Sequence, residues 1–273
     1  MGRKMRLAAG LSLLFFASAG CTVLEDRTPC PCYLDIDYRK VLESGFMETG
    51  AGRVEVILLP QEGGWCGNHP LSDCPELEEV TVVKSRLQAV AAVHSRPGAM
   101  FAGGSTEVRF APGNQIDSIF IHTSEVDCSG EEAHCLIEPR KQFSTLFFSD
   151  EEGGAICREY NMVIRGTTCG FDAADCSPIE GEYLYTVQEY DACGLISVRI
   201  PRQIRDDLML EFWDKDDHLK RFSCPVGKWI FAAGYDPVAE ELSDYSLRVD
   251  FRQALLYLRV SDWEEEYVYK LFE

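Results

Sequence analysis

Apolar and polar residues alternate along most of this chain. Leu34, Ile36 and Tyr38 are separated by charged residues, and the same period of two recurs in short runs bounded by Gly, Pro, Asp and Asn. Successive side chains of a strand point to opposite faces, so this pattern predicts half-buried antiparallel strands. The first series covers Tyr33–Arg39, Val54–Leu58, Thr106–Phe110, Ile116–His122 and Phe143–Phe148.

A second series of strands follows the run Asp-Glu-Glu-Gly-Gly at 150–154, which is typical of a turn or linker. Two such series predict an all-β chain with two tandem β-sandwiches, because each sheet must bury one face against another. We expect an N-terminal sandwich over residues 33–148 and a C-terminal sandwich over residues 149–273. The strands of the second series are Ile156–Arg165, Tyr183–Val187, Leu195–Ile200, Leu208–Trp213, Lys228–Phe231, Ser246–Phe251, Leu255–Val260 and Glu266–Phe272.

One stretch, Glu76–Val93, fits two interpretations. Its apolar residues Val80, Val83, Leu87 and Val90 could form one face of a helix. Its β-branched content also allows two strands, and the sequence leaves both open.

The N-terminus predicts export. Basic residues precede an apolar run from Leu7 to Ala19, and small residues lead into Cys21. This is the layout of a secretory signal, and an apolar run of about 13 residues is too short for a spanning helix. The small residues before Cys21 indicate a signal peptide over 1–20, lipidation of Cys21 and a linker over 21–32. Ordinary secretion with an incidental cysteine is the alternative.

The net charge limits the classes of molecule that this protein can bind. Removing the signal leaves 23 basic and 45 acidic residues, a net charge of −22. Such a chain repels nucleic acid, and acidity spread over a chain that is 46% hydrophobic indicates a solvated globular surface. Glu25 and Asp26, close behind Cys21, resemble a signal for display on the outer face of the outer membrane; a solvated linker is the alternative.

The cysteines suggest disulfides. Cys21 leaves 11 of the 12 cysteines, an odd number that suits an oxidising compartment with at least one thiol unpaired within the chain. Three pairs each flank a short loop and could close it, although connectivity does not follow from sequence: Cys66/Cys74, Cys128/Cys135 and Cys169/Cys176. A zinc site at Cys128, His134 and Cys135, with Cys30 and Cys32 as distant partners, is a weaker alternative, because its spacing matches no common structural site.

No catalytic pattern stands out. The chain has no His-Glu-x-x-His, Gly-x-Ser-x-Gly, phosphate loop or Gly-x-Gly-x-x-Gly, and its five histidines are scattered. The acidic run at 214–217 could suggest calcium, but it lacks the turn glycine and the further ligands of a calcium loop, and a charged hairpin turn explains it better. We therefore expect no enzyme, metal, cofactor or small-molecule substrate.

Three segments resemble one family, the FimB-type anchor and accessory lipoproteins of Bacteroides-type (type V) fimbriae. They are the start from Cys21 to Asp37 with its Cys-Pro-Cys, the run Gly-Asn-Gln-Ile-Asp-Ser-Ile-Phe-Ile-His at 113–122, and the run Pro-Val-Gly-Lys-Trp-Ile-Phe-Ala-Ala-Gly-Tyr-Asp at 225–236. The resemblance implies two transthyretin-like β-sandwiches and a structural place in a pilus. It implies shaft subunits as partners and an outer-membrane, surface-exposed location held by lipid.

The resemblance also suggests how subunits join. Shaft subunits of this class are thought to lose an N-terminal strand and receive one from a neighbour, by β-strand addition. We expect an anchor to keep its lipid and its first strand, with Leu34, Ile36 and Tyr38, and so to terminate the fibre. An arginine-specific protease could remove that strand by cutting after Arg39 or Arg53. The candidate joining strands carry Leu256, Leu258, Val260, Tyr267, Tyr269 and Leu271, which could equally be ordinary strands of the second sandwich.

A tip-associated adhesin or a surface glycan-binding lipoprotein is the competing interpretation. Sugar faces stack on exposed aromatic rings, and Trp65 is the tryptophan expected on a loop. The other three, Trp213, Trp229 and Trp263, fall at strand positions.

Overall fold

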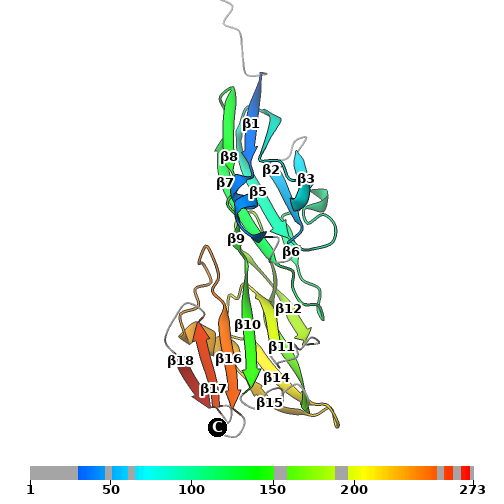
Figure 1. Ribbon diagram of the computed structural model, residues 1–273, viewed down its shortest axis with the longest axis vertical. Coiled ribbons are helices and arrows are strands. Elements are labelled where there is room, and N and C mark those ends of the chain that lie inside the picture. Colours follow the sequence, from blue (N-terminus) through cyan, green and yellow to red (C-terminus); the bar gives the residue numbers. More distant parts are fainter. Residues whose placement is uncertain are drawn as a thin grey trace, which may run out of the picture.

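Strands dominate the computed structural model, which describes residues 30–46, 51–60, 65–150, 159–187, 196–250, 255–260 and 266–270. They form four sheets, stacked as two sandwiches along the long axis of the molecule (Figure 1). The prediction of an all-β chain with two tandem sandwiches is confirmed. Cys21, and with it the predicted signal peptide, lies outside the described residues.

The N-terminal sandwich packs a three-stranded sheet, β4-β1-β8, on a five-stranded sheet, β3-β2-β5-β7-β9. Its strands are β1 (Pro31–Asp37), β2 (Arg53–Leu59), β3 (Cys66–Pro70), β4 (Leu77–Val83), β5 (Arg86–His94), β7 (Ile119–Asp127), β8 (Glu132–Leu136) and β9 (Arg140–Lys141). The helices are α1 (Arg39–Glu43) and the 3₁₀ turns η2 (Leu71–Asp73) and η3 (Ala102–Gly104).

The C-terminal sandwich packs the sheet β12-β11-β14-β15 against β13-β10-β16-β17-β18. Its strands are β10 (Phe143–Asp150), β11 (Tyr160–Asp172), β12 (Pro178–Thr186), β13 (Ile196–Pro201), β14 (Met209–Asp214), β15 (Lys220–Cys224), β16 (Tyr245–Asp250), β17 (Leu255–Val260) and β18 (Glu266–Lys270). The short strand β6 (Glu107–Arg109) adds to β11, and helix α3 (Val226–Ala232) follows β15.

Strand pairing places the boundary between the two sandwiches earlier in the chain than the sequence predicted. The sequence analysis placed Phe143–Phe148 at the end of the N-terminal sandwich, but β10 pairs with β13 and β16 of the C-terminal one. β6 likewise leaves its neighbours in sequence to pair with β11. Alternation shows that a segment is a strand, but it carries no information on which distant strand it will meet.

Two local assignments are settled by the structure. The ambiguous stretch at 76–93 forms two strands, β4 and β5, separated by a turn. The strand expected at Lys228–Phe231 is wrong, because the segment is helix α3. Pro225 cannot donate to the ladder of β15, and the buried residues Val226, Trp229, Ile230 and Ala233 have the i, i+3, i+4, i+7 spacing of a helix face.

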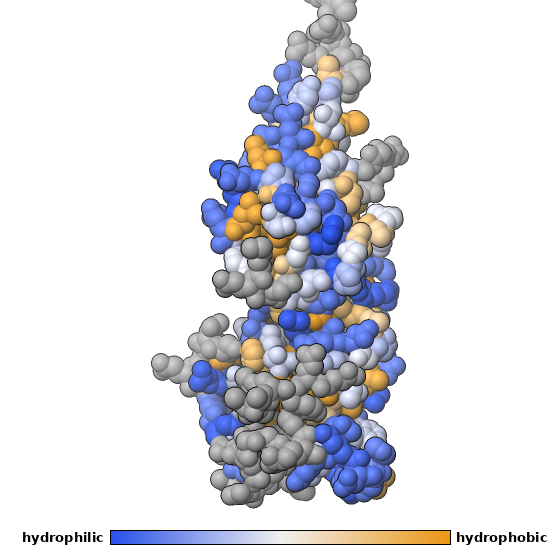
Figure 2. Space-filling model, turned by 45° about the vertical axis from the view of Figure 1, so that its right-hand side comes forward, coloured by the Kyte–Doolittle hydropathy of each residue, from blue (hydrophilic) through white to orange (hydrophobic). Residues whose placement is uncertain are grey.

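The surface is largely polar. Figure 2 shows one face that is mostly hydrophilic, with hydrophobic residues confined to small, separated patches. Acidic and basic side chains pair across it, as Arg221 does with Asp214 and Asp217 in the turn between β14 and β15. This charged hairpin turn is the one expected from the sequence. No helix in the described part of the chain is long and apolar enough to cross a membrane.

Candidate assembly site

The predicted N-terminal strand lies at the centre of its own sheet (Figure 1). β1 pairs with β4 in antiparallel fashion over seven residue pairs and with β8 in parallel over five. Leu34, Ile36 and Tyr38 are completely buried, whereas Tyr33 is 46% exposed. Alternate side chains of a strand point to opposite faces, which explains this division. The core of the N-terminal sandwich is therefore built on this strand.

A buried carboxylate closes the end of β1. Asp37 accepts hydrogen bonds from the backbone N–H of Arg39 at 3.0 Å and from its guanidinium, and His134 Nε2 lies 3.3 Å from the same carboxylate. The hydrogen bond from the Arg39 guanidinium outweighs burial and holds the pKa of Asp37 well below its usual range. Arg39 also begins α1. The peptide bond after Arg39, where an arginine-specific protease would cut, thus lies at the start of a helix and beside an ion pair.

The predicted joining residues lie in two strands of the C-terminal sandwich. β17 and β18 end the sheet β13-β10-β16-β17-β18, and the outer edge of β18 pairs with no other described strand. Leu258 and Val260 are buried, while Tyr267 and Tyr269 are half-buried. The ring of Tyr269 stacks on Trp229 of α3, with centroids 4.9 Å apart and planes at 15°. The side chain of Leu256 and the whole of Leu271 fall outside the described part.

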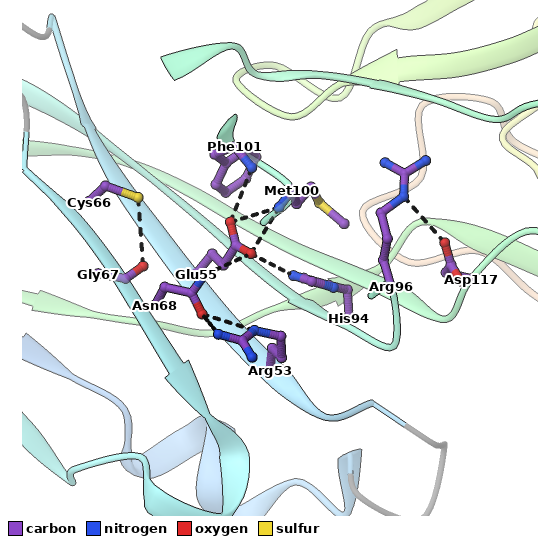
Figure 3. Close-up of polar contacts among 10 residues, drawn as sticks. All are labelled: Arg53, Glu55, Cys66, Gly67, Asn68, His94, Arg96, Met100, Phe101 and Asp117. Carbon is purple, nitrogen blue, oxygen red and sulfur yellow. Dashed lines mark hydrogen bonds and ion pairs between the residues drawn. The ribbon is translucent and has the colours of Figure 1, made fainter. Parts of the chain in front are cut away.

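A second buried carboxylate was not singled out from the sequence. Glu55, in the middle of β2, is fully buried. It accepts hydrogen bonds from the backbone N–H groups of Met100 at 2.8 Å and Phe101 at 3.1 Å, from His94 Nε2 at 3.2 Å and from Asn68 Nδ2 at 3.2 Å (Figure 3). The signal available in the sequence was a glutamate inside the apolar run Val-Glu-Val-Ile-Leu-Leu at 54–59, because a buried charge must be paired.

This carboxylate fixes the connection between the two sandwiches. Beyond Phe101 the chain passes through η3 into β6, which pairs with β11 of the C-terminal sandwich. Arg53 completes the cluster by donating to the Asn68 side chain at 3.0 Å, and Arg96 lies 3.5 Å from the Asp117 carboxylate along the same connection (Figure 3). Glu55 therefore couples the five-stranded sheet to the segment that enters the other domain.

Glu55 predicts a loss of stability in acid. Burial disfavours its charge, but hydrogen bonds from His94 and from two backbone amides outweigh burial and lower the pKa of Glu55. A lowered folded-state pKa contributes stability that is complete above the unfolded pKa of about 4.3 and is lost as the pH falls towards the folded value. Denaturant unfolding below about pH 5 should therefore show a falling free energy of unfolding. In the Glu55→Gln variant the free energy of unfolding should fall less steeply as the pH decreases. An unchanged pH dependence would contradict a lowered pKa for Glu55.

Polar side chains also bond the two sandwiches where β9 runs into β10. Gln142, the one residue between these strands, is buried. Its side-chain oxygen accepts a hydrogen bond from Arg202 at 2.8 Å, and the same guanidinium donates to two backbone carbonyls at 2.7 and 2.9 Å. Lys141 forms an ion pair with Asp244 at 2.9 Å. The chain that crosses between the sandwiches is therefore held to the C-terminal part by both hydrogen bonds and an ion pair.

The structure forms none of the three predicted disulfides. All nine described cysteines are free thiols. In the predicted pairs, Cys66 Sγ faces the Gly67 carbonyl and Cys74 Sγ the Pro75 carbonyl, while Cys135 Sγ lies 3.7 Å from Ser124 Oγ. Cys169 Sγ lies 3.7 Å from the Glu180 carbonyl. Short loops between cysteines predicted closure, but the thiols of Cys66, Cys74, Cys135 and Cys169 lie against other groups. The Cys32 thiol helps to raise the pKa of Cys128.

The described tryptophans are engaged within the fold. Trp65 is half-buried and covers Gly67, where an added Cβ would lie 2.5 Å from its ring. Trp213 donates to Glu211 at 3.1 Å, and Trp229 is stacked as above. Trp263 lies outside the described residues. The ring expected to stack on sugars is therefore packed against its own domain.

Solved structures share this fold. A candidate polysaccharide-binding protein from Bacteroides thetaiotaomicron matches with a TM-score of 0.61 at 14% identity, over 89% of this chain and 99% of that one. A candidate adhesin from Bacteroides ovatus matches with a TM-score of 0.58 at 10% identity, over 89% and 96%. The fimbrial anchor protein Mfa2 from Porphyromonas gingivalis matches with a TM-score of 0.55 at 9% identity, over 86% and 98%.

The fold is similar to that of a fimbrial anchor protein. No protein-family model matches the sequence, and no curated protein matches it either. The resemblance noted in the sequence is thus confirmed at the level of the fold, across nearly the whole length of each structure compared.

Proposed function

We propose that this protein is a structural lipoprotein subunit of a fimbrium, which anchors the fibre to the outer membrane and terminates it through β-strand exchange. The observation that carries the proposal is the position of β1, which fills the centre of its own sheet with Leu34, Ile36 and Tyr38 buried. The shared fold with the Porphyromonas gingivalis fimbrial anchor supports it.

The protein would terminate the fibre because β1 already occupies the place that a donor strand would fill. Strand addition needs an open place in a sheet, where ladder hydrogen bonds give affinity and alternate side chains fill pockets. β1 has neighbours on both sides, so a donor strand from another subunit finds this place filled. The outer edge of β18 lies at the other end of the molecule, and its pairing is open among the described strands. The protein then joins shaft subunits at one end only.

The lipid and the retained strand act together. Tyr33 lies 12 positions after Cys21, so cleavage that removes the strand would also remove the lipid. β1 starts at the end of the molecule far from the C-terminal sandwich and runs along the long axis (Figure 1). Tension between the membrane and the fibre would load its ladder hydrogen bonds in shear, all at once, rather than opening them one by one.

Replacing Cys21 with serine tests the anchor. Without an acyl-accepting thiol the subunit loses its lipid, and we expect fimbriae to appear in the growth medium instead of on cells, because two or more acyl chains are needed for stable anchoring. Cys30→Ser, which changes an exposed cysteine of the same segment, is the matched control and should leave fimbriae on cells. Fibres that stay attached in the Cys21→Ser strain would favour a tip or adhesin role.

Deleting Tyr267–Glu273 tests the joining edge. β18 is an edge strand with half-buried tyrosines, so its removal should leave a cooperatively folded protein that is no longer incorporated into fibres. The measurements are thermal unfolding and immunodetection in purified fimbriae. Arg248→Ala, which removes an exposed ion pair to Glu266, is the control and should change neither. Gross misfolding of the deletion variant would show that β18 is simply part of the sandwich.

A glycan-binding role is the second candidate, favoured by one surface feature. An open pocket of about 510 Å³ on the C-terminal sandwich is lined by Arg165, Thr167, Glu180, Arg205 and Asp207, among others. Several of its groups are already paired: Arg205 donates to Glu180 at 2.5 Å and Thr167 to Asp207 at 2.5 Å. Specific binding on a glycan array that is lost in Arg205→Ala would support this function over the structural one.

A further inference from the structure

Two fully buried cysteines from distant parts of the sequence meet in the N-terminal sandwich. Cys32 is the second residue of β1, and Cys128 directly follows β7, 96 positions later. Both have no exposed surface, and the Cys32 thiol lies near enough to the Cys128 thiol to help raise its pKa. The backbone holds each in place, because Cys32 is paired with Val82 in the β1–β4 ladder and the Cys128 N–H donates to the Ser85 carbonyl at 2.9 Å.

We propose that Cys32 and Cys128 form a disulfide in the exported protein. Both side chains are buried in the same core, beside the segment 82–85 that connects the two sheets, and a disulfide forms when side-chain rotation brings two such neighbouring sulfurs to about 2.05 Å. The predicted alternative, Cys128 with Cys135, is less well placed, since the Cys135 thiol is hydrogen-bonded to Ser124. This proposal stands on the two side chains and does not depend on the fimbrial role.

The reaction is a thiol–disulfide exchange with a protein disulfide of the export compartment. One cysteine thiolate attacks that disulfide to give a mixed disulfide, and the second thiolate displaces it. The new S–S bond forms as the S–S bond of the oxidant breaks, and the oxidant takes up two electrons and, through solvent, the two thiol protons to become a dithiol. Both side chains are fully buried in the folded protein, and burial raises the pKa of the Cys128 thiol to about 12, so neither is accessible and Cys128 is not ionised. Oxidation therefore precedes closure of the sandwich.

The bond would join the two sheets of the N-terminal sandwich covalently. β1 is the central strand of the three-stranded sheet, while β7 lies between β5 and β9 in the five-stranded sheet. A strand that is cross-linked near its start cannot leave its sheet for another subunit. Tension entering at β1 would pass into the opposite sheet through a covalent bond as well as through ladder hydrogen bonds.

Peptide mapping tests the bond directly. The full chain is purified from an exporting host with free thiols alkylated at lysis, and is then digested with trypsin without reduction. Cys30 shares the tryptic peptide 28–39 with Cys32, and Cys135 shares the peptide 110–140 with Cys128, so the Cys30→Ala/Cys135→Ala variant is mapped alongside. We expect peptides 28–39 and 110–140 to be linked in both proteins. Alkylated Cys32 and Cys128, or a wild-type bond between Cys128 and Cys135, would overturn the proposal.

Thermal unfolding gives a second, independent result. Cys32→Ala, Cys128→Ala and the double variant should each lower Tm by about 10 °C, and by the same amount, because any of them removes one bond. Wild-type protein refolded in reductant should show the same loss. Cys224 is a fully buried cysteine of the C-terminal sandwich, and Cys224→Ala is the control. Its change in Tm should be the same with and without reductant. Additive losses that are insensitive to reductant would mean that the two side chains contribute only packing.

Discussion

Replacing Glu55 with alanine is expected to lower the free energy of unfolding by about 3–5 kcal/mol. The substitution removes the carboxylate that meets the N–H groups of Met100 and Phe101 and His94 Nε2, all of them buried. A buried donor left without an acceptor has lost its hydrogen bonds to water without a replacement. The segment leading to β6 should then loosen, which urea unfolding and amide hydrogen exchange of residues 100–109 would both detect.

An exposed glutamate of the same sheet provides the control for that prediction. Glu125→Ala on β7 removes the same group from a solvated position, and we expect a change within about 0.5 kcal/mol. If Glu55→Ala changed stability as little as Glu125→Ala does, the carboxylate would not hold the connection between the sandwiches.

Replacing Ile36 with alanine should lower the free energy of unfolding by about 2–5 kcal/mol. Ile36 is fully buried near the end of β1, where its side chain contributes to the core of the N-terminal sandwich. Truncation removes buried apolar surface and leaves a cavity that the surrounding strands fill only in part. The loss should appear as a lower denaturant midpoint together with faster hydrogen exchange in β1, β4 and β8.

Tyr33→Ala is the matched control on the same strand. Tyr33 points to the opposite face and is 46% exposed, so its loss should cost less than about 1 kcal/mol. A similarly small cost for Ile36→Ala would mean that β1 could leave its sheet easily, which would remove the basis for a retained terminal strand.

Local patterns predicted most strands but not their partners. The alternation at 34–38 identified β1 and its buried face, because a period of two is visible within a single strand. Its placement between β4 and β8 depends on residues 77–83 and 132–136, which no local rule connects to it. The same limit explains why β10 was assigned to the N-terminal sandwich. Helix α3 was missed because a short apolar run fits either period.

Only part of the site could be predicted, because contacts between segments that are distant in sequence leave no local pattern. Cys32 belongs to the Cys-Pro-Cys start that carried the resemblance, but its contact with Cys128 appears only when β1 and the end of β7 meet in the folded chain. Loop length favoured Cys128 with Cys135, which are close in sequence. Glu55 was detectable as a charge within an apolar strand, although its donors come from Asn68 and from residues 94–101, well separated along the chain.

The N-terminus of the subunit in assembled fibres tests the central claim most directly. Fimbriae are purified from cells by detergent extraction, and the protein's first residue is determined by mass spectrometry of its N-terminal peptide. We expect a lipidated Cys21 followed by the intact segment through β1. A start at Lys40 or Val54, the products of cleavage after Arg39 or Arg53, would show that the strand and its lipid are removed, and would contradict a retained strand that anchors and terminates the fibre.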